Sequence, residues 1–324
     1  TLIPMPARNA APSRLVADVG GTNTRLALFE PATNAYRALT TYINRDYSRF
    51  EDIIASWLGA LDEPAPTHCC IAVAAPPADD RVTMINIDWS FSCRDLAKRF
   101  GFTDLLWLND FQSNAYALPH LSDADKALLR AGTGADPGKL ATVGPGTGLG
   151  GSTLEMVAGR ARAHACEPGH MGLAPATPLE LEVFRVLLPR HGDIHAELLV
   201  SGPGLQRLYQ TLAEIHGLTV ETLTPEEISR RALQAEDGPC RDALATFCAL
   251  LGSVCGDFVL ANGAYAGLYL AGGIVPRMIP FIRDSQFEQR FQRKGAMHDH
   301  LARVPLYVIT TPQPGLIGAA HAPL

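Results

Sequence analysis

The sequence predicts an α/β protein built from two domains. The chain has 324 residues, and one domain typically takes roughly 100 to 200. Two short apolar runs, 15–19 and 25–29, flank a glycine-rich turn, and a second such turn joins the runs 141–143 and 152–157. Strand patterns alternate with helical patterns beyond the first hairpin, which is typical of α/β domains. The two glycine-rich hairpins indicate two halves of similar plan.

The first half has clear strand and helix signals. Apolar residues recur at helical spacing across 49–61, and the continuously apolar run 69–75 is typical of a buried strand that ends at Pro76. Ser92 is a suitable N-cap for the helix that follows it. The expected strands are 15–19, 25–29, 39–43, 69–75 and 105–108, and the expected helices are 49–61, 92–100 and 112–118.

The second half is richer in helical patterns. Its most apolar stretch, 248–275, contains Asp257, Asn262 and six glycines, which favours a buried helix and strand over a membrane span. The expected strands are 141–143, 152–157, 268–270 and 304–309, and the expected helices are 179–188, 204–215, 224–235, 241–263 and 317–322.

Pro119 marks the expected domain boundary. Residues 1–14 are rich in Pro and Ala and lack the apolar core of a secretory signal, so we expect a flexible tail. Near the end of the last expected strand, the chain is expected to cross back to the first domain, which then contains the closing helix. The predicted division is therefore 15–119 with about 308–324 for one domain, and 120–307 for the other.

Composition limits the function classes. Hydrophobic residues make up 47% of the chain, charged residues 19%, and the net charge is −6, so a general nucleic-acid or anionic-membrane partner is not expected. The cysteines are odd in number and form no C-x-x-C pair, which predicts reduced thiols, a cytoplasmic protein and no structural zinc site. They are Cys69, Cys70, Cys93, Cys166, Cys240, Cys248 and Cys255.

The first glycine-rich turn, 18–25, has the composition of a phosphate-binding hairpin. Glycine lets backbone N–H groups approach an anion without a Cβ in the way. Asp18 ends an apolar strand, where a charge is unusual, and a Mg²⁺ ion held directly or through its waters would explain it. A plain hairpin with a surface carboxylate is the alternative. The predicted nucleotide contacts are Gly20, Gly21, Thr22, Asn23 and Arg25.

Two further glycine-rich segments extend this prediction. Residues 144–152 contain five glycines but no Gly-Lys-Ser/Thr, so they form no Walker A loop, and Gly146, Thr147 and Gly148 are the expected phosphate contacts. Residues 270–276 run from a strand into Gly272 and Gly273, where an adenine or ribose can lie against the backbone. A turn that simply requires small residues is the alternative for this last segment.

Asn109 and Asp110 follow the predicted strand 105–108. A carboxylate at the carboxyl end of a parallel strand lies where α/β folds bind ligands. Phosphoryl transfer to an alcohol needs a group that accepts the hydroxyl proton, and Asp110 has the chemistry for that role, with Asn109 as a neighbouring hydrogen-bond partner. Asp110 as the cap of a helix that begins near Gln112 is the alternative.

A third group of polar residues suits a polyol ligand. Glu167 and His170 lie in an expected loop, and Glu197 precedes an apolar run. Sugar hydroxyls both donate and accept: carboxylates accept from them, and an imidazole can donate to them or accept from them. A structural histidine and solvated glutamates are the alternatives.

Taken in order, these motifs resemble the bacterial hexokinase-type glucokinases of the actin/sugar-kinase/chaperone ATPase superfamily, and specifically the type without zinc. Several long motifs in the right order are more specific than any one alone. The matching segments are DVGGTNTRLALF at 18–29, LNDFQSNAYALP at 108–119, GPGTGLGGS at 144–152, EPGHMGLAP at 167–175, SGPGL at 201–205, LAGGIVPRM at 270–278 and PGLIGAA at 314–320.

The resemblance implies an actin-like (ribonuclease H-like) fold with a small α/β domain, a larger α+β domain and an active site in the cleft between them. It implies transfer of the ATP γ-phosphoryl group to the 6-hydroxyl of glucose with Mg²⁺, the first step of glucose catabolism, in a homodimer. Asp110 is the implied base. The implied sugar contacts are Asn86, Asn109, Asp110, Glu167, His170 and Glu197.

Some points depart from the family or stay open. Pro168 stands where the family commonly has glycine, so the sugar loop is expected to differ locally. No cysteine cluster follows His170, so no zinc is expected. A preference for mannose or fructose, and ADP or polyphosphate as the phosphoryl donor, remain alternatives. A sugar-responsive transcription regulator is disfavoured because only 14 residues precede Leu15, and an ATPase without a sugar substrate leaves Asn109, Glu167 and His170 unexplained.

Overall fold

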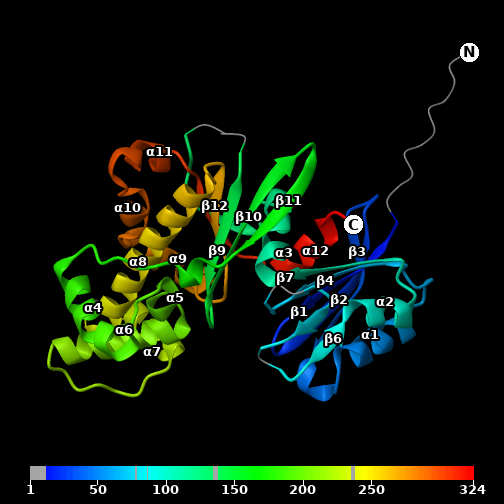
Figure 1. The fold of residues 1–324 in the computed structure, drawn as a ribbon, viewed down its shortest axis with the longest axis horizontal. Coiled ribbons are helices and arrows are strands. Elements are labelled where there is room, and N and C mark those ends of the chain that lie inside the picture. The colour runs from blue at the N-terminus through cyan, green and yellow to red at the C-terminus, as the bar shows by residue number, and fades with distance from the viewer. Residues whose placement is uncertain (1–11, 77–78, 86, 134–137, 235–237) are drawn as a thin grey trace, which may run out of the picture. The chain divides into compact units, whose positions relative to one another are not determined.

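The structure is a computed structural model that describes residues 12–76, 79–85, 87–133, 138–234 and 238–324. The chain forms two compact units (Figure 1): the first is Thr1–His120 with Pro312–Leu324, and the second is Leu121–Thr311. Strands and helices alternate in both, as the predicted α/β class requires.

The first unit contains a five-stranded sheet in the order β3-β2-β1-β4-β7. Its strands are β1 (Arg14–Val19), β2 (Asn23–Glu30), β3 (Ala35–Ile43), β4 (His68–Val73) and β7 (Asp104–Asn109). Strand β1 pairs antiparallel with β2 and parallel with β4, and β4 pairs parallel with β7. The carboxyl ends of β1, β4 and β7 therefore meet at one edge of the sheet.

Helices cover both faces of this sheet (Figure 1). Phe50, Ile53 and Trp57 of α1 pack with alternate residues of β1, such as Leu15 and Ala17, in the core on one face. Helix α12 packs against α3 and β1. The helices of this unit are α1 (Phe50–Gly59), α2 (Cys93–Phe100), α3 (Asp110–Ala117) and α12 (Pro314–His321), with the short strands β5 (Arg81–Thr83) and β6 (Ser90–Ser92).

Helices α3 and α12 approach very closely. A Cβ added to Gly318 would lie 1.7 Å from the carbonyl oxygen of Ser113, so only glycine fits at that position. The Ser113 Oγ also donates to the carbonyl of Gly315 at 2.7 Å. The end of the chain is thereby fixed beside the helix that follows β7.

The second unit contains a six-stranded sheet in the order β11-β10-β9-β12-β13-β8. Its strands are β8 (Lys126–Arg130), β9 (Leu140–Pro145), β10 (Leu149–Val157), β11 (Arg160–Cys166), β12 (Gly267–Leu270) and β13 (Leu306–Ile309). Its helices are α4 (Pro178–His191), α5 (Ala196–Leu199), α6 (Gly202–Ile215), α7 (Pro225–Gln234), α8 (Pro239–Asn262), α9 (Ile279–Asp284), α10 (Phe287–Gln292) and α11 (His298–Ala302).

Helix α8 is the central core helix of the second unit. A Cβ on Gly252 would lie 2.2 Å from the carbonyl oxygen of Phe287, and one on Gly256 would lie 2.3 Å from that of Phe291, so glycines allow α10 to pack closely. Among the helices of the described residues, α8 has the length and apolar composition of a membrane span, but 83% of its most apolar window is buried inside the protein. The buried helix and following strand predicted for 248–275 are confirmed.

The sequence missed several elements. Strand β11 carries arginines at alternate positions and lies at the edge of its sheet, so it lacks the apolar signal of a buried strand. Strand β8 lies at the other edge of the same sheet, strands β5 and β6 have three residues each, and the helices α9 to α11 have at most six residues each. At the start of the chain, residues 1–11 lie outside the described residues, and Arg14 already belongs to β1.

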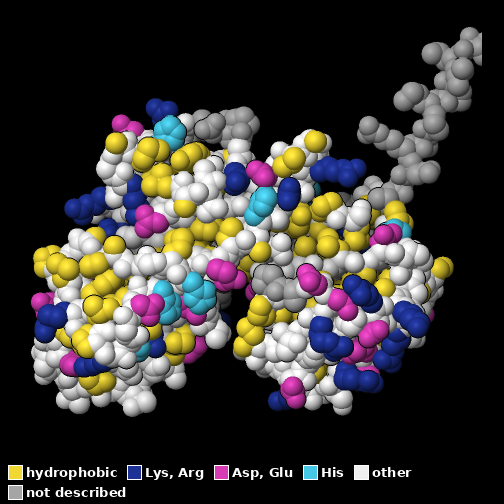
Figure 2. All heavy atoms as spheres, viewed as in Figure 1, with side chains coloured by type: hydrophobic (Ala, Val, Ile, Leu, Met, Phe, Trp, Pro, Cys, Tyr) yellow, Lys and Arg dark blue, Asp and Glu magenta, His cyan; other side chains and the backbone are white. Residues whose placement is uncertain are grey.

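Charged side chains of both signs lie on the surface, as the similar numbers of basic (27) and acidic (33) residues lead one to expect. On the visible face of each unit, basic and acidic side chains are interspersed (Figure 2). All seven cysteines are free thiols, and five of them are buried.

Candidate functional site

The first glycine-rich turn joins β1 to β2. Asp18 of β1 stands opposite Arg25 of β2, and the Asp18 Oδ2 lies 3.7 Å from the Arg25 Nη1. Burial raises the pKa of the Asp18 carboxyl, and the nearby Arg25 only partly opposes that shift. The turn thus holds a half-buried carboxylate, 21% exposed, at the end of a core strand.

The amino end of α12 lies against this carboxylate. A Cβ on Gly315 would lie 2.8 Å from the Asp18 Oδ1, so glycine is required there for Asp18 to keep its position. The segment 314–320 is one of the sequence motifs, but its sequence indicates no place in the site. Only the fold reveals its contact with Asp18, because 297 positions separate the two residues (315 − 18).

The residues around Asp18 fit a Mg²⁺ ion. Mg²⁺ is usually held by one or two carboxylates together with substrate phosphates, rather than by a full set of protein ligands. Asp18 offers one carboxylate beside the glycine turn. Within the described ranges, no group of three or more His, Cys, Asp or Glu side chains has the geometry of a metal site.

Asn109 and Asp110 lie where β7 passes into α3. Asn109 is the N-cap: its Oδ1 accepts from the Phe111 N–H at 3.0 Å, and Gln112 completes a capping box. Its Nδ2 donates to the Ala75 carbonyl at 2.8 Å. The helix therefore begins at Asp110, two residues earlier than the sequence predicted, because Asn109 and not Asp110 provides the cap. These two bonds leave one N–H of the amide for a ligand, and the sugar contact predicted for Asn109 stays a prediction.

Asp18 and Asp110 lie at the same edge of the sheet. In the ladder, Val19 pairs with Val73, and Val73 pairs with Asn109, so β1, β4 and β7 end level with one another. Neighbouring strands are about 4.8 Å apart, which places the ends of β1 and β7 roughly 10 Å apart. The Asp110 Oδ1 accepts from the Phe111 N–H at 3.0 Å, which fixes the direction of its carboxylate.

The second glycine-rich turn joins β9 to β10 in the other unit. The Gly146 N–H donates to the Gly148 carbonyl at 2.8 Å, and the Gly146 carbonyl accepts from the Gly202 N–H at 2.7 Å at the start of α6. A Cβ on Gly272 would lie 2.4 Å from the Pro145 carbonyl oxygen, and Gly272 has a φ of +87°. The two glycine segments of this unit, 144–152 and 270–276, are therefore in contact.

Thr147, a predicted phosphate contact, is exposed at the tip of the turn.

Glu197 of α5 connects this turn to the predicted sugar residues. Its Oε2 accepts from the Leu149 N–H at 2.8 Å. A Cβ on Gly148 would lie 2.5 Å from that oxygen, and one on Gly169 would lie 3.0 Å from it. The sequence predicted Glu197 as a sugar residue but gave no sign of this bond.

Glu167 precedes a short 3₁₀ turn, Pro168–His170, and His170 is its last residue, where the sequence predicted a loop. Both side chains are exposed. Pro168 is buried at the first position of the turn, where a missing N–H costs little, and its ring lies over Gly151, whose Cβ would be 2.7 Å from the Pro168 Cγ. The proline thus fills a space that a glycine at 168 would leave open.

Two of the predicted site residues, Asn86 and Gly273, and one residue that was not predicted, His195, remain to be placed. Asn86 lies outside the described residues. Gly273 has no atom within 4 Å of an added Cβ, so its outer side is open. The ring of His195 lies 5.7 Å from that of His170, between ring centroids, and no local sequence signal pointed to it.

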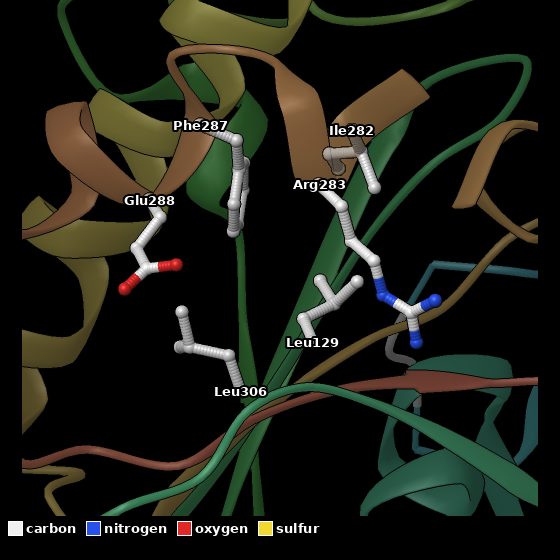
Figure 3. A pocket seen from close by; sticks show the side chains of 6 residues that line it. All are labelled: Leu129, Ile282, Arg283, Phe287, Glu288 and Leu306. Carbon is white, nitrogen blue, oxygen red and sulfur yellow. The ribbon is translucent and has the colours of Figure 1, made fainter. Parts of the chain in front are cut away.

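A separate pocket of about 150 Å³ lies in the second unit (Figure 3). It is lined by Leu129, Ile282, Arg283, Phe287, Glu288 and Leu306. None of the predicted site residues contributes to it, so it is distinct from the candidate site.

Comparisons with known proteins agree with this arrangement. The family model "Glucokinase" matches residues 15–323. A glucokinase from Chromobacterium violaceum is 42% identical over 309 residues, which cover 95% of this chain and 88% of the relative. The crystal structure of a glucokinase from an Antarctic psychrotroph is 35% identical, covers 95% of this chain and 98% of its own, and has a TM-score of 0.88.

A solved structure with much lower sequence identity has the same fold. A ROK family glucokinase from Streptomyces griseus, in complex with glucose and AMPPNP, has a TM-score of 0.61 at 19% identity, with 95% of this chain and 98% of its own covered. Likeness at that identity shows the fold alone. The predicted two-domain actin-like ATPase fold is confirmed, and with 42% identity to a curated relative and a family match over residues 15–323, the chain belongs to the glucokinase family.

Proposed function

We propose that this protein phosphorylates glucose at its 6-hydroxyl with ATP, giving glucose 6-phosphate. Family membership supports the reaction class. The observation that carries the proposal is the level ending of β1, β4 and β7, which brings the β1–β2 turn, the proposed phosphate site, and Asp110 to one sheet edge. A separation of roughly 10 Å leaves room for a phosphoryl group and the attacking hydroxyl between them.

Asp110 is the proposed general base. The reaction breaks the bond between the γ-phosphorus and its bridging oxygen and forms one from the sugar oxygen to that phosphorus. Asp110 accepts the proton of the 6-hydroxyl, and ADP leaves with the bridging oxygen. Asp110 is the first residue of α3 and is oriented by the Phe111 N–H, so its carboxylate is held before the sugar arrives.

The phosphates are proposed to bind the backbone of the glycine turns. Gly20, Gly21, Thr22, Asn23 and Arg25 would act from the first unit, and Gly146, Thr147 and Gly148 from the second. Gly272 and Gly273 would lie along the nucleoside. Asp18 would hold Mg²⁺, directly or through water, and the bound ion would neutralise charge on the phosphate oxygens. Zinc has no part in the proposal.

Glucose is proposed to bind both units. Asn86, Asn109 and Asp110 would act from the first, and Glu167, His170 and Glu197 from the second. The exposed Glu167 and His170 are available to sugar hydroxyls, and the bond from the Leu149 N–H orients the carboxylate of Glu197. The solved ROK family glucokinase, whose complex holds glucose and AMPPNP, supports the choice of both substrates.

One assay tests this function. Purified protein is offered glucose, mannose or fructose, each with ATP, ADP or polyphosphate, and product formation is followed by a coupled reaction. We expect turnover with glucose and ATP in the presence of Mg²⁺, and its loss when the metal is chelated. No product from glucose and ATP would contradict the proposal, and a higher kcat/KM with another pair would replace the substrate named here.

A cytoplasmic homodimer is proposed for the assembled protein. The seven free thiols suit a reducing compartment, and the resemblance implies the dimer. Light scattering coupled to size exclusion measures the mass directly. A mass near 34.7 kDa, that of one chain, would contradict the dimer.

A further inference from the structure

The buried side chain and backbone of Asn44 hold the β1–β2 turn from one side, called here the inner side of the turn. Asn44 is 1% exposed and follows β3 directly. Its Nδ2 donates to the Gly20 carbonyl at 2.7 Å, and its Oδ1 accepts from the Thr24 Oγ1 at 2.8 Å. Its backbone N–H donates to the Thr22 carbonyl at 2.9 Å. One residue, distant in sequence from the turn, thus holds it at three points.

These bonds change the turn from an ordinary two-residue hairpin. The Gly20 N–H donates to the Asn23 carbonyl at 3.0 Å, as a hairpin requires. In an ordinary hairpin the Asn23 N–H would donate back to the Gly20 carbonyl. That return bond is absent among the described residues, and the Gly20 carbonyl accepts from Asn44 instead.

The consequence is a fixed direction for two donors. In a trans peptide, the carbonyl of one residue and the N–H of the next point in opposite directions. No peptide bond of the described residues is cis. Because the carbonyls of Gly20 and Thr22 point toward Asn44, the N–H groups of Gly21 and Asn23 point away from it. The side of the turn away from Asn44 therefore presents the N–H groups of Gly21 and Asn23 as donors. The carbonyl oxygens of Gly20 and Thr22, which would repel an anion, lie on the inner side, which faces Asn44.

We propose that Asn44 is a positioning residue for the nucleotide. It does not contact the phosphates. It holds the turn so that the Gly21 and Asn23 amides face the phosphates of ATP without a conformational change on binding. This inference rests on the proposed function of the turn. It adds a residue that lies 24 positions from Gly20 and belongs to none of the motifs in the sequence.

The test compares Asn44→Ala with a matched control, Ser92→Ala. Ser92 is also a buried polar residue of the first unit, 7% exposed. It donates to the Asp80 Oδ2 at 2.7 Å and accepts from the Asp95 N–H at 3.2 Å, in a helix cap outside the candidate site. Both variants lose buried hydrogen bonds, so both are expected to lose stability. Only Asn44→Ala is expected to lose affinity for the nucleotide.

The readouts are KM for ATP, KM for glucose, and the Kd for ADP measured by calorimetry. For Asn44→Ala we expect KM for ATP and the Kd for ADP to rise roughly tenfold, with KM for glucose changed by less than about twofold. Ser92→Ala should leave all three near the wild-type values. If Asn44→Ala fails to fold, Asn44→Ser, which is too short to reach both Gly20 and Thr24, takes its place with the same expectation.

The outcomes separate this inference from the function on which it rests. An unchanged Kd for ADP in the Asn44 variant, or equal changes for ATP and glucose, would overturn the positioning role. A wild-type protein that binds ADP but phosphorylates no sugar would sink the proposed function and leave the ADP titrations to decide the role of Asn44. A wild-type protein that binds no ADP would overturn both.

Discussion

The two glycine-rich turns of this protein are built differently. The β1–β2 turn of the first unit depends on side chains: Asn44 holds its carbonyls, and Arg25 faces Asp18. The β9–β10 turn of the second unit depends mainly on close packing at glycines that leave no room for a Cβ: Gly272 lies against the Pro145 carbonyl, and Gly148 lies against the Glu197 side chain. Substitutions in the first unit should therefore alter chemistry and affinity, whereas those in the second should first alter packing.

The largest expected effect is on the first unit's chemistry. Asp110→Ala removes the proposed base, and we expect kcat to fall roughly 10²- to 10⁴-fold, the usual contribution of a general base. Glucose binding, measured by intrinsic fluorescence or calorimetry, should persist because the other sugar contacts remain. A variant that kept near-wild-type kcat would show that another group takes the proton.

In the second unit, Gly272→Ala should act through packing. The new Cβ would lie 2.4 Å from the Pro145 carbonyl oxygen, at a φ of +87°. We expect a loss of about 2–4 kcal/mol in the free energy of unfolding. Thermal or denaturant unfolding measures it.

Gly273→Ala is the matched control for that prediction. Its added Cβ meets nothing within 4 Å, and its φ is not in the left-handed region. We expect its stability to stay within about 0.5 kcal/mol of wild type. Equal destabilisation of the two variants would mean that the contact with Pro145 is not what requires glycine at 272.

Substitution of Glu197 tests whether a side chain of the second unit also contributes to substrate binding. Glu197→Gln keeps an oxygen that can accept from the Leu149 N–H but removes the charge. We expect stability to be retained and KM for glucose to rise roughly tenfold, because a charged hydrogen-bond acceptor is lost. Glu197→Ala should also lower the stability. An unchanged KM for glucose in the Gln variant would restrict Glu197 to supporting the turn.

A last prediction concerns α12, whose first turn contacts Asp18, and its effect appears only at acidic pH. At its other end, the ring of His321 stacks on that of His120 with centroids 3.6 Å apart. Burial, then His120 and Arg14, lowers the pKa of His321 from 6.5 to about 4, and burial also lowers the pKa of His120. The unfolded chain therefore binds more protons than the folded one between those values.

Stability is accordingly expected to fall as the pH drops from about 6.5 toward about 4. Thermal unfolding across this range measures it, and His321→Gln should flatten the dependence relative to wild type. The same slope in both proteins would assign the effect to other groups.

Much of the fold was predictable because its signals are local. Periodic apolar residues predicted α1, α4, α6, α7 and α8, and continuous apolar runs predicted β4 and β7. Strand β11 was missed because an edge strand need not be apolar, and the short helices α9 to α11 offer too few turns for a periodic pattern. The start of α3 was misplaced because Asn109 and Asp110 can both cap a helix, and only their surroundings decide between them.

The sequence by itself determined the order of the motifs, the family they indicate, and the residue types available for phosphate, proton and sugar. Tertiary structure alone decided which of them meet. Asn44 reaches Gly20 across 24 positions, and Leu149 reaches Glu197 across 48. Strand register and helix packing bring such pairs together, and neither leaves a local periodicity in the chain. The β1–β2 turn is recognisable from its glycines, but the direction of its amides depends on an asparagine that belongs to none of the motifs.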